Sequence, residues 1–283
     1  MPAVAAQAPR VVETELAGVP AHIRVPAVVS APPIVLWHGF GPPASEEALM
    51  ALLPLDEIPA VKVYLGLPMF GKRASADREA LAQRQTEDLA TGVFEPLVMG
   101  AALELPRVVD ALRREGCVEA GRGIGLFGFS ASGAAVLHAL AEHQVAVESA
   151  VVLNASTGLT ASVAAYERAT GRHYEWTPRA RALARRSDAV VRAADIARGL
   201  RPPALLIVHG AKDGMVDGNG PHALYRALAP HYARYGPRRL ALETIDGLGH
   251  AVQAPDDVAR VRALVGAWFL RHLQRDGTGR GGA

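Results

Sequence analysis

Residues 123–133 read Gly-Ile-Gly-Leu-Phe-Gly-Phe-Ser-Ala-Ser-Gly, and this stretch decides the fold. Its apolar first half predicts a strand, and the Ala/Leu-rich run that follows, up to His143, predicts a helix. Ser130 stands where the strand turns into the helix, between small neighbours that let the backbone approach closely. These features predict a nucleophile elbow, the sharp turn that exposes a serine hydroxyl at the end of a strand.

The elbow pattern departs from G-x-S-x-G at one position, because Ser132 replaces the second glycine. A glycine-rich turn without chemistry gives a similar pattern by chance. The location between a predicted strand and a predicted helix favours the elbow, since the motif requires that context. Serine is also small enough for the same tight turn.

Further short apolar runs on both sides of the elbow predict a sheet. The predicted strands are 11–16 and 21–25, which form an edge hairpin, then 34–37, 61–65, 148–153, 204–208 and 240–245. Helical patterns cover 45–53, 77–116 and 255–273, and the second of these is interrupted near Thr91-Gly92 and bent or broken by Pro96 and Pro106. Buried strands that alternate with helices predict an α/β fold with a mainly parallel sheet and helices on both faces.

The strand pattern stops between residues 157 and 203, which we call the cap segment. It contains helical patterns over 160–170, over a stretch that Thr177 caps with Pro178 at its first position, and over 188–198. We expect a single domain over residues 1–283 in which the cap segment is a small helical insertion above the carboxyl ends of the strands. An ordinary crossover with extra helix is the alternative.

Composition excludes several classes of protein. Half of the 283 residues are apolar and the net charge is only +2, so the chain is globular and no nucleic-acid partner is expected. A single cysteine, Cys117, excludes an intramolecular disulfide framework. The first ten residues lack the basic and apolar regions of a secretory signal, and no apolar run approaches membrane-spanning length. We therefore expect a cytoplasmic protein without membrane insertion, and a homo-oligomer stays open.

A serine nucleophile needs a base within hydrogen-bond reach and a third group that orients the base. Among ten histidines, His250 stands out, because it follows the last strand on the flexible loop Gly-Leu-Gly-His. His38 and His209 also follow strands, but each begins a His-Gly pair and is expected to bond to turn backbone instead.

Three aspartates are candidates for the orienting acid. Asp213 lies closest to the end of the strand 204–208, so its carboxylate is best placed to reach the imidazole. Asp217 is expected to cap the helix that begins near Gly218, and Asp246 is ranked last. Hydrolysis also requires donors for the developing oxyanion, for which we expect the backbone amides of Ala131 and Phe40.

With these motifs in hand, the chain resembles the α/β-hydrolase family. The order Ser130, Asp213, His250 is that of the family, and the run 38–41, His-Gly-Phe-Gly, looks like its oxyanion loop. The run 209–216, His-Gly-x-x-Asp-x-x-Val, is similar to its acid motif. The closest likeness is to the dienelactone-hydrolase and prolyl-oligopeptidase-like branch. Asp217 stands where many relatives carry proline, so the choice of Asp213 rests on the motif.

The resemblance implies a serine hydrolase that cleaves a carboxylic ester of a small-molecule acyl substrate through an acyl-enzyme, with no metal and no organic cofactor. Tyr166, Tyr174 and Trp176 of the cap segment would either line an acyl pocket or pack the cap onto the core. A peptidase or thioesterase that uses the same catalytic residues is the alternative. Related peptidases often carry an additional propeller domain, and the sequence shows no repeats that would form one. A non-catalytic binding module would not need the three polar residues together. Haloalkane or epoxide hydrolysis would require aspartate at position 130.

Overall fold

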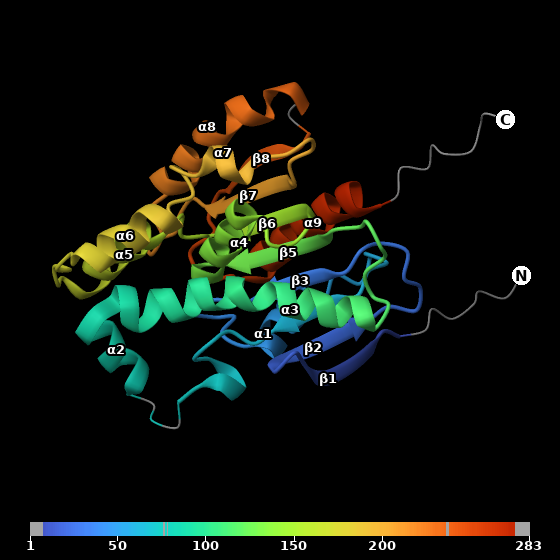
Figure 1. The fold of residues 1–283 in the computed structure, drawn as a ribbon, viewed down its shortest axis with the longest axis horizontal. Coiled ribbons are helices and arrows are strands. Elements are labelled where there is room, and N and C mark those ends of the chain that lie inside the picture. The colour runs from blue at the N-terminus through green and yellow to red at the C-terminus, as the bar shows by residue number, and fades with distance from the viewer. Residues whose placement is uncertain (1–7, 76, 78, 236–237, 275–283) are drawn as a thin grey trace, which may run out of the picture.

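A computed structural model describes residues 8–75, 77, 79–235 and 238–274. Its centre is an eight-stranded sheet of order β1-β2-β4-β3-β5-β6-β7-β8 (Figure 1). The strands are β1 (Arg10–Leu16), β2 (Val19–Val25), β3 (Ile34–Trp37), β4 (Lys62–Leu65), β5 (Ile124–Phe129), β6 (Val147–Leu153), β7 (Ala204–Gly210) and β8 (Leu240–Ile245). The hairpin of β1 and β2 joins antiparallel to β4, and all other neighbours are parallel. The mainly parallel sheet predicted from the sequence is confirmed.

The parallel register brings the ends of non-adjacent segments to one edge. Trp37 at the end of β3 pairs with Gly128 near the end of β5, and Leu153 at the end of β6 pairs with both Phe129 and Val208. The loops that follow β3, β5, β6, β7 and β8 therefore meet at the carboxyl edge of the sheet. This is where parallel α/β folds place their ligands.

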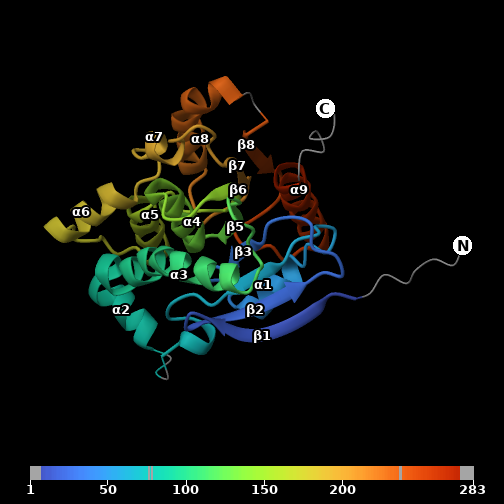
Figure 2. The same cartoon turned by 45° about the vertical axis from the view of Figure 1, so that its right-hand side comes forward.

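Helices cover both faces of the sheet (Figure 2). The helices are α1 (Glu46–Leu52), α2 (Ala80–Asp88), η2 (Leu89–Met99), α3 (Gly100–Arg114), α4 (Ala131–Glu142), α5 (Leu159–Thr170), α6 (Pro178–Ser187), α7 (Ala193–Ile196), α8 (Asn219–Tyr232) and α9 (Pro255–Leu273), with short 3₁₀ turns at Gly71–Arg73 and Ala233–Tyr235. Alternate residues of the strands pack into two apolar clusters, one with α3, α4 and α8 and one with α1 and α9. Each central strand is buried on both sides, which explains its continuous apolar sequence.

The segment 80–114 is interrupted once, close to the predicted position. Asp88, between α2 and η2, has extended backbone (φ −160°, ψ 101°), and its side chain accepts from the amides of Ala90 and Thr91. The prolines do not break the helix, because the π-helix η2 contains Pro96 and continues into α3, which contains Pro106. The wider turns of a π-helix accommodate the proline, which has no amide N–H to donate and would otherwise interrupt the backbone hydrogen bonds of an α-helix. Residues 91–92 belong to the first turn of this π-helix, so the interruption predicted near Thr91-Gly92 lies about one turn earlier, at Asp88.

The same run corrects a second expectation. By length and composition Ala80–Arg114 is apolar enough to cross a membrane, although 56% of its most apolar window is buried inside the protein. The expectation that no apolar run approaches membrane-spanning length was therefore wrong. A core helix meets the same criterion, and burial of Val93, Leu97 and Leu105 against the sheet side explains the composition.

The cap segment holds α5, α6 and the short α7. Thr177 caps α6 as expected, since its hydroxyl accepts from the amide of Ala180 at 3.1 Å. The expected helix over 188–198 shrinks to the four residues of α7, because the Asp188 side chain accepts from the amides of Val190 and Val191 and holds a turn there. Helices α5 and α6 contact η2, whereas α7 packs beside α4 and α8. The division into one domain with a cap stays a prediction, and residues 1–7 lie outside the described part.

Candidate functional site

The elbow at Ser130 has the strained backbone that the sequence predicts. Ser130 has φ 59° and ψ −121°, between the end of β5 and the first residue of α4. A positive φ is unfavourable for a residue with a side chain, so the surrounding structure must hold it. The end of β5 and the first turn of α4 lie very close together. A Cβ on Gly128 would lie 2.5 Å from the Ser132 carbonyl oxygen, so only glycine fits there.

Ser132, which replaces the usual glycine, has a bonded hydroxyl. Its Oγ accepts from the amide of Phe129 at 2.9 Å and lies 3.0 Å from the carbonyl oxygen of Trp37, to which it can donate. The side chain is completely buried. Its one proton can go to Trp37 or to the carbonyl oxygen of Phe129 at 2.9 Å, so Ser132 fastens the turn and can link it to the end of β3, contacts that glycine cannot make.

Ser130, His250 and Asp213 are brought together from the ends of three strands. Ser130 Oγ lies 2.9 Å from His250 Nε2, and His250 Nδ1 lies 2.9 Å from Asp213 Oδ2. The Asp213 side chain is 0% exposed and that of His250 is 16% exposed. An imidazole bonded on both sides can accept the serine proton while the carboxylate stabilises the positive ring that results.

The Asp213 carboxylate is held ionised by its neighbours. Its Oδ1 accepts from the amides of Met215 at 2.8 Å and Val216 at 2.9 Å. Burial by itself would raise the pKa of Asp213, but the hydrogen bond from His250 and those two amides outweigh burial and lower the pKa below its usual value. A buried carboxylate with a low pKa suits the orientation of a histidine.

The other candidate acids lie elsewhere. Asp217 is fully exposed, and its Oδ1 accepts from the amide of Asn219 at the start of α8, as expected of a capping residue. Asp246 is exposed, and the structure describes no contact between its carboxylate and His250. Asp213 is therefore the aspartate that the structure places beside the imidazole.

No described hydrogen bond joins His38 or His209 to Ser130. The expectation that His209 bonds to turn backbone was wrong, because its buried Nδ1 has no hydrogen-bond partner among the described residues. His38 is completely buried, and its Nδ1 lies 2.8 Å from the carbonyl oxygen of Gly39. Burial lowers the pKa of both histidines, so both stay neutral. His38 also packs edge-on against Phe70, which places it in the support of the loop that follows β3.

That loop lies directly against the elbow. A Cβ on Gly39 would come within 2.8 Å of the Phe129 ring and 3.0 Å of Ser130 Cβ. Phe40 follows it, and its ring stacks on Phe70 at 5.1 Å. Ala131 is the first residue of α4, so its amide has no acceptor within the helix. Gly39 therefore lies against Ser130, and the role of the Phe40 and Ala131 amides as oxyanion donors stays a prediction.

Asn154 is a site residue that the sequence reasoning missed. It directly follows β6, is completely buried and has φ 46°. Its Nδ2 donates to the carbonyls of Gly249 and His250, both at 2.9 Å, and its Oδ1 accepts from the amide of Gly210 at 2.8 Å. One side chain thus joins the loop that carries His250 to the strand that leads to Asp213. Asparagine is among the few residues that tolerate this backbone conformation, and that was the available signal.

The cap aromatics make packing contacts. Tyr174 is 7% exposed, donates from its hydroxyl to Asp88 Oδ1 at 2.7 Å and meets Trp176 edge-on. Tyr166 and Trp176 are partly buried against the main apolar cluster. These contacts agree with the alternative in which the aromatics hold the cap on the core, and contact with substrate stays a prediction.

Within the described residues, no group of three or more His, Cys, Asp or Glu side chains is placed to hold a metal ion. Cys117 is a half-buried free thiol, and its pKa is raised by burial and by Glu115. A raised pKa makes a thiol a weaker nucleophile at neutral pH, which separates it from the chemistry at Ser130.

Comparison with known proteins gives a matching family profile. The profile of the prolyl oligopeptidase family matches residues 104–276, more than half of the chain, and this range contains Ser130, Asp213 and His250. No match was found among the curated proteins with which the chain was compared.

Solved structures with the same fold include hydrolases of different kinds. Protein TT1662 of Thermus thermophilus is 22% identical, with a TM-score of 0.70, over 93% of this chain and 98% of that chain. Acylaminoacyl peptidase of Pyrococcus horikoshii is 15% identical, with a TM-score of 0.66, over 96% of this chain and 43% of the peptidase. Carboxyl esterase 2 of Tuber melanosporum is 15% identical, with a TM-score of 0.62, over 96% of this chain and 90% of the esterase. The chain therefore spans less than half of the peptidase.

Proposed function

Since the chain belongs to the prolyl oligopeptidase family of serine hydrolases, we propose that it cleaves a carboxylic ester of a small or medium-sized acyl substrate. Ser130 is the proposed nucleophile, His250 the base and Asp213 the orienting acid. The observation that carries the proposal is the unbroken hydrogen-bond chain from Ser130 Oγ through His250 to Asp213, with both contacts at 2.9 Å.

In the first half of the proposed reaction, neutral His250 accepts the proton of Ser130 at Nε2 while Oγ attacks the ester carbonyl carbon. The carbonyl electron pair moves to its oxygen, and the amides of Phe40 and Ala131 stabilise the negative charge that develops there. The carbon–oxygen bond to the alcohol then breaks, and His250 returns its proton to the departing alkoxide. An acyl group remains on Ser130.

In the second half, His250 takes a proton from water, whose oxygen attacks the acyl carbon. The bond to Ser130 Oγ breaks, and the serine regains its proton from His250. The products are a carboxylic acid and an alcohol. Throughout, Asp213 stays ionised and stabilises the protonated ring, in keeping with its lowered pKa, in which its hydrogen bonds outweigh burial.

A peptidase is the second candidate, because the matching family is named for an oligopeptidase. The same nucleophile attacks amides, but an amide nitrogen must be protonated before it leaves, so cleavage depends more on proton donation by His250. The ester is preferred because it demands less of this step. An acyl arylamide panel beside an ester panel separates the two candidates.

A fluorophosphonate probe tests the nucleophile, and short-chain p-nitrophenyl esters test turnover. We expect the probe to label Ser130, and we expect Ser130→Ala and His250→Ala each to lower kcat by about 10⁴-fold to 10⁶-fold. Ser149→Ala is the matched control, since Ser149 is buried in β6 with no described hydrogen bond to its hydroxyl. Folded wild-type protein that stays unlabelled, or full turnover in Ser130→Ala, would refute the proposal.

A further inference from the structure

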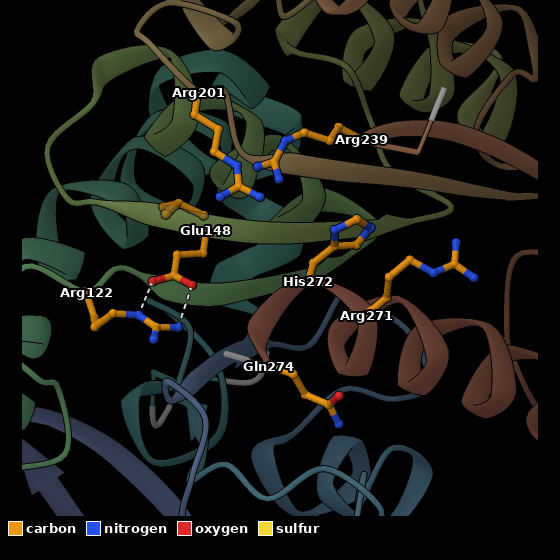
Figure 3. A pocket seen from close by; sticks show the side chains of 8 residues that line it. Arg122, Glu148, Arg201, Arg239, Arg271, His272 and Gln274 are labelled. Atoms are coloured by element: carbon orange, nitrogen blue, oxygen red, sulfur yellow. Dashed lines mark hydrogen bonds and ion pairs between the residues drawn. The ribbon is translucent and has the colours of Figure 1, made fainter. Parts of the chain in front are cut away.

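A second concave site lies at the opposite edge of the sheet from Ser130. It is a pocket of about 320 Å³ that we call the arginine pocket (Figure 3). Its lining side chains are mainly polar and come from Arg122, Val147, Glu148, Arg201, Arg239, Arg271, His272 and Gln274. The volume is at the lower end of the range for small-molecule sites.

The lining residues share one position in the fold. Arg122, Arg201 and Arg239 precede β5, β7 and β8, and Glu148 lies at the start of β6. Arg271 belongs to the last turn of α9. The pocket is therefore built from the amino ends of four parallel strands, whereas Ser130 follows a carboxyl end. The seven residues of β6 span about 20 Å at ~3.3 Å per residue, so the two sites are separate.

The charges of the pocket are not balanced within the described residues. Four arginines line it, and Glu148 is the one carboxylate among the lining side chains. Glu148 is already engaged, because Arg122 binds it with Nε at 2.7 Å and with Nη2 at 2.9 Å. Among the described residues no carboxylate pairs with Arg201, Arg239 or Arg271.

Two of the unpaired guanidinium groups converge. Figure 3 shows Arg201 and Arg239 reaching from neighbouring strand ends into the same part of the pocket, above the pair of Arg122 and Glu148. Arg239 donates to the carbonyl oxygen of Pro202 from Nε at 3.2 Å and from Nη2 at 2.6 Å, which fixes its position. Burial and the charge of Arg201 lower the pKa of Arg239, as expected where positive charge lacks a counter-ion.

His272 responds to the same excess of charge. Burial, followed by Arg239, Arg271 and Arg201, lowers the pKa of His272 to about 4. Its Nε2 has no hydrogen-bond partner among the described residues. The pocket is thus positive at neutral pH through its arginines, with the histidine neutral.

We propose that the arginine pocket binds a compact phosphate-type oxyanion, either inorganic phosphate or the phosphate group of a small ester. Paired guanidinium groups match the tetrahedral oxygens of phosphate, and Arg201 supplies donors that no described carboxylate occupies. The concave shape and small volume favour a small molecule over a polyanionic chain, which would need an extended basic surface. This binding does not depend on the reaction proposed at Ser130.

Isothermal titration calorimetry on the full chain tests the proposal. The probes are sodium phosphate and phenyl phosphate, with sodium chloride at equal ionic strength as the blank and citrate as a carboxylate comparison. We expect saturable binding of one phosphate per chain, weakened about tenfold in Arg201→Gln. Arg201→Lys keeps the charge but loses the planar pair of N–H donors, so its affinity for phosphate should lie between those of Arg201→Gln and wild type. If phenyl phosphate binds more tightly than phosphate, the ligand is an ester.

Arg226→Gln is the control, because Arg226 lies exposed on α8, has no described partner and carries the same charge. It should change the affinity by less than about twofold, since a distant surface charge is screened by salt. Equal weakening in Arg226→Gln and Arg201→Gln would overturn the proposal, because it would indicate a response to net charge alone. Absence of saturable phosphate binding, or tighter binding of citrate, would also overturn it.

Chemical modification locates the ligand independently of affinity. Phenylglyoxal modifies accessible arginines, and phosphate should protect Arg201 and Arg271 in peptide mapping while Arg226 stays reactive. Protection of all three to the same extent, or of none, would contradict a bound ligand in the arginine pocket.

Discussion

The two ends of the parallel strands use polar residues in opposite ways. At the carboxyl end, Asp213 accepts from two amides and an imidazole, and Asn154 bonds to three backbone groups. At the amino end, Arg201 and Arg271 have no described carboxylate partner. Polar groups whose hydrogen bonds are all made are held in a fixed geometry, and proton transfer from Ser130 to His250 needs such a geometry. Arginines without a carboxylate partner can instead bind an anionic ligand.

This contrast has a topological origin at one end only. Parallel strands bring their following loops together, so the fold itself assembles the site at Ser130. The amino end has no such rule, and its pocket depends on which residues happen to precede β5, β7 and β8. Replacement of Asp213, Asn154 and Ser132 should disturb the satisfied end in that order of decreasing effect.

Replacement of the buried acid gives the largest effect. Asp213→Asn removes the charge that stabilises protonated His250 and favours the wrong ring tautomer, so we expect kcat to fall by about 10⁴-fold. Asp217 is exposed and caps α8, so Asp217→Asn should change kcat by less than about threefold. Ester hydrolysis with matched active-site titration measures both.

The comparison of these two variants also settles which acid works with His250. If Asp217→Asn lost more activity than Asp213→Asn, the assignment of Asp213 would fall, and the loop 213–217 would have to rearrange in solution. Circular dichroism of both variants verifies that the fold is retained.

Asn154 gives the next largest effect. Asn154→Ala leaves the carbonyls of Gly249 and His250 and the amide of Gly210 without partners, at a cost in stability of about 3 kcal/mol. We expect kcat to fall by about 10-fold to 100-fold with KM nearly unchanged, because the imidazole is displaced while substrate contacts remain. Steady-state kinetics on the p-nitrophenyl ester measures this separation.

A purely structural role for Asn154 predicts a different result. In that case the unfolding temperature would fall, but kcat per folded molecule would not. Asn154→Asp keeps the acceptor for Gly210 but buries a carboxylate against the carbonyl oxygens of Gly249 and His250, so it should reproduce the kcat defect with a larger loss of stability than Asn154→Ala. Ser149→Ala is the control in β6.

Residues at the ends of strands were the most predictable part of this protein. Ser130, Asp213 and His250 each follow an apolar run with turn residues, and such runs mark buried parallel strands reliably. The three residues then lie close together because the carboxyl ends of parallel strands meet at one edge of the sheet. The hairpin of β1 and β2, the Ser45 cap of α1 and the bounds of α9 follow from equally local signals.

Features that depend on contacts distant in sequence were missed. Asn154 is a lone polar residue after a strand, and only its partners 56 and 96 residues away reveal its use. The π-helical turns around Pro96 depend on packing against α4 and the cap segment, which no local pattern encodes. The arginine pocket likewise assembles residues from 122 to 274 that share no motif.

Two histidines with lowered pKa values allow a test by acid titration. Burial, which outweighs the opposing charge of Glu142 and is aided by Arg192 and Arg186, lowers the pKa of His138 to about 4, and the pKa of His272 is lowered to a similar value. Unfolding returns each to about 6.5, so the unfolded state binds more protons between pH 6.5 and 4, and stability must fall as pH falls through this range. His138 is 3% exposed and should contribute about 2 kcal/mol of loss between pH 8 and 5.

Urea unfolding at both pH values measures this loss in wild type and in His138→Leu. The variant cannot titrate at this position, so its loss of stability on acidification should be smaller by about 2 kcal/mol. His231→Gln on the exposed side of α8 is the control and should leave the difference unchanged. An identical pH dependence in wild type and His138→Leu would contradict a lowered pKa of His138. His272 is more exposed, so its contribution is smaller.

The smallest effect is expected at Ser132, beside the nucleophile. Ser132→Ala removes a hydroxyl that accepts from Phe129 N and can donate to Trp37 O, so stability should fall by about 1 to 2 kcal/mol. Ser130 keeps its bonds to His250 and to the carbonyl oxygen of Leu153, so kcat should fall by less than about fivefold. Ser132→Gly restores the usual motif but adds backbone freedom to the unfolded chain, and it should be slightly less stable than Ser132→Ala. Thermal unfolding and ester kinetics on both variants decide between a hydroxyl that only fastens the turn and one that sets the nucleophile. A loss of kcat in Ser132→Ala as large as that in Asn154→Ala, at unchanged stability, would mean that the elbow geometry depends on this bond and that the satisfied end of the sheet extends to β3.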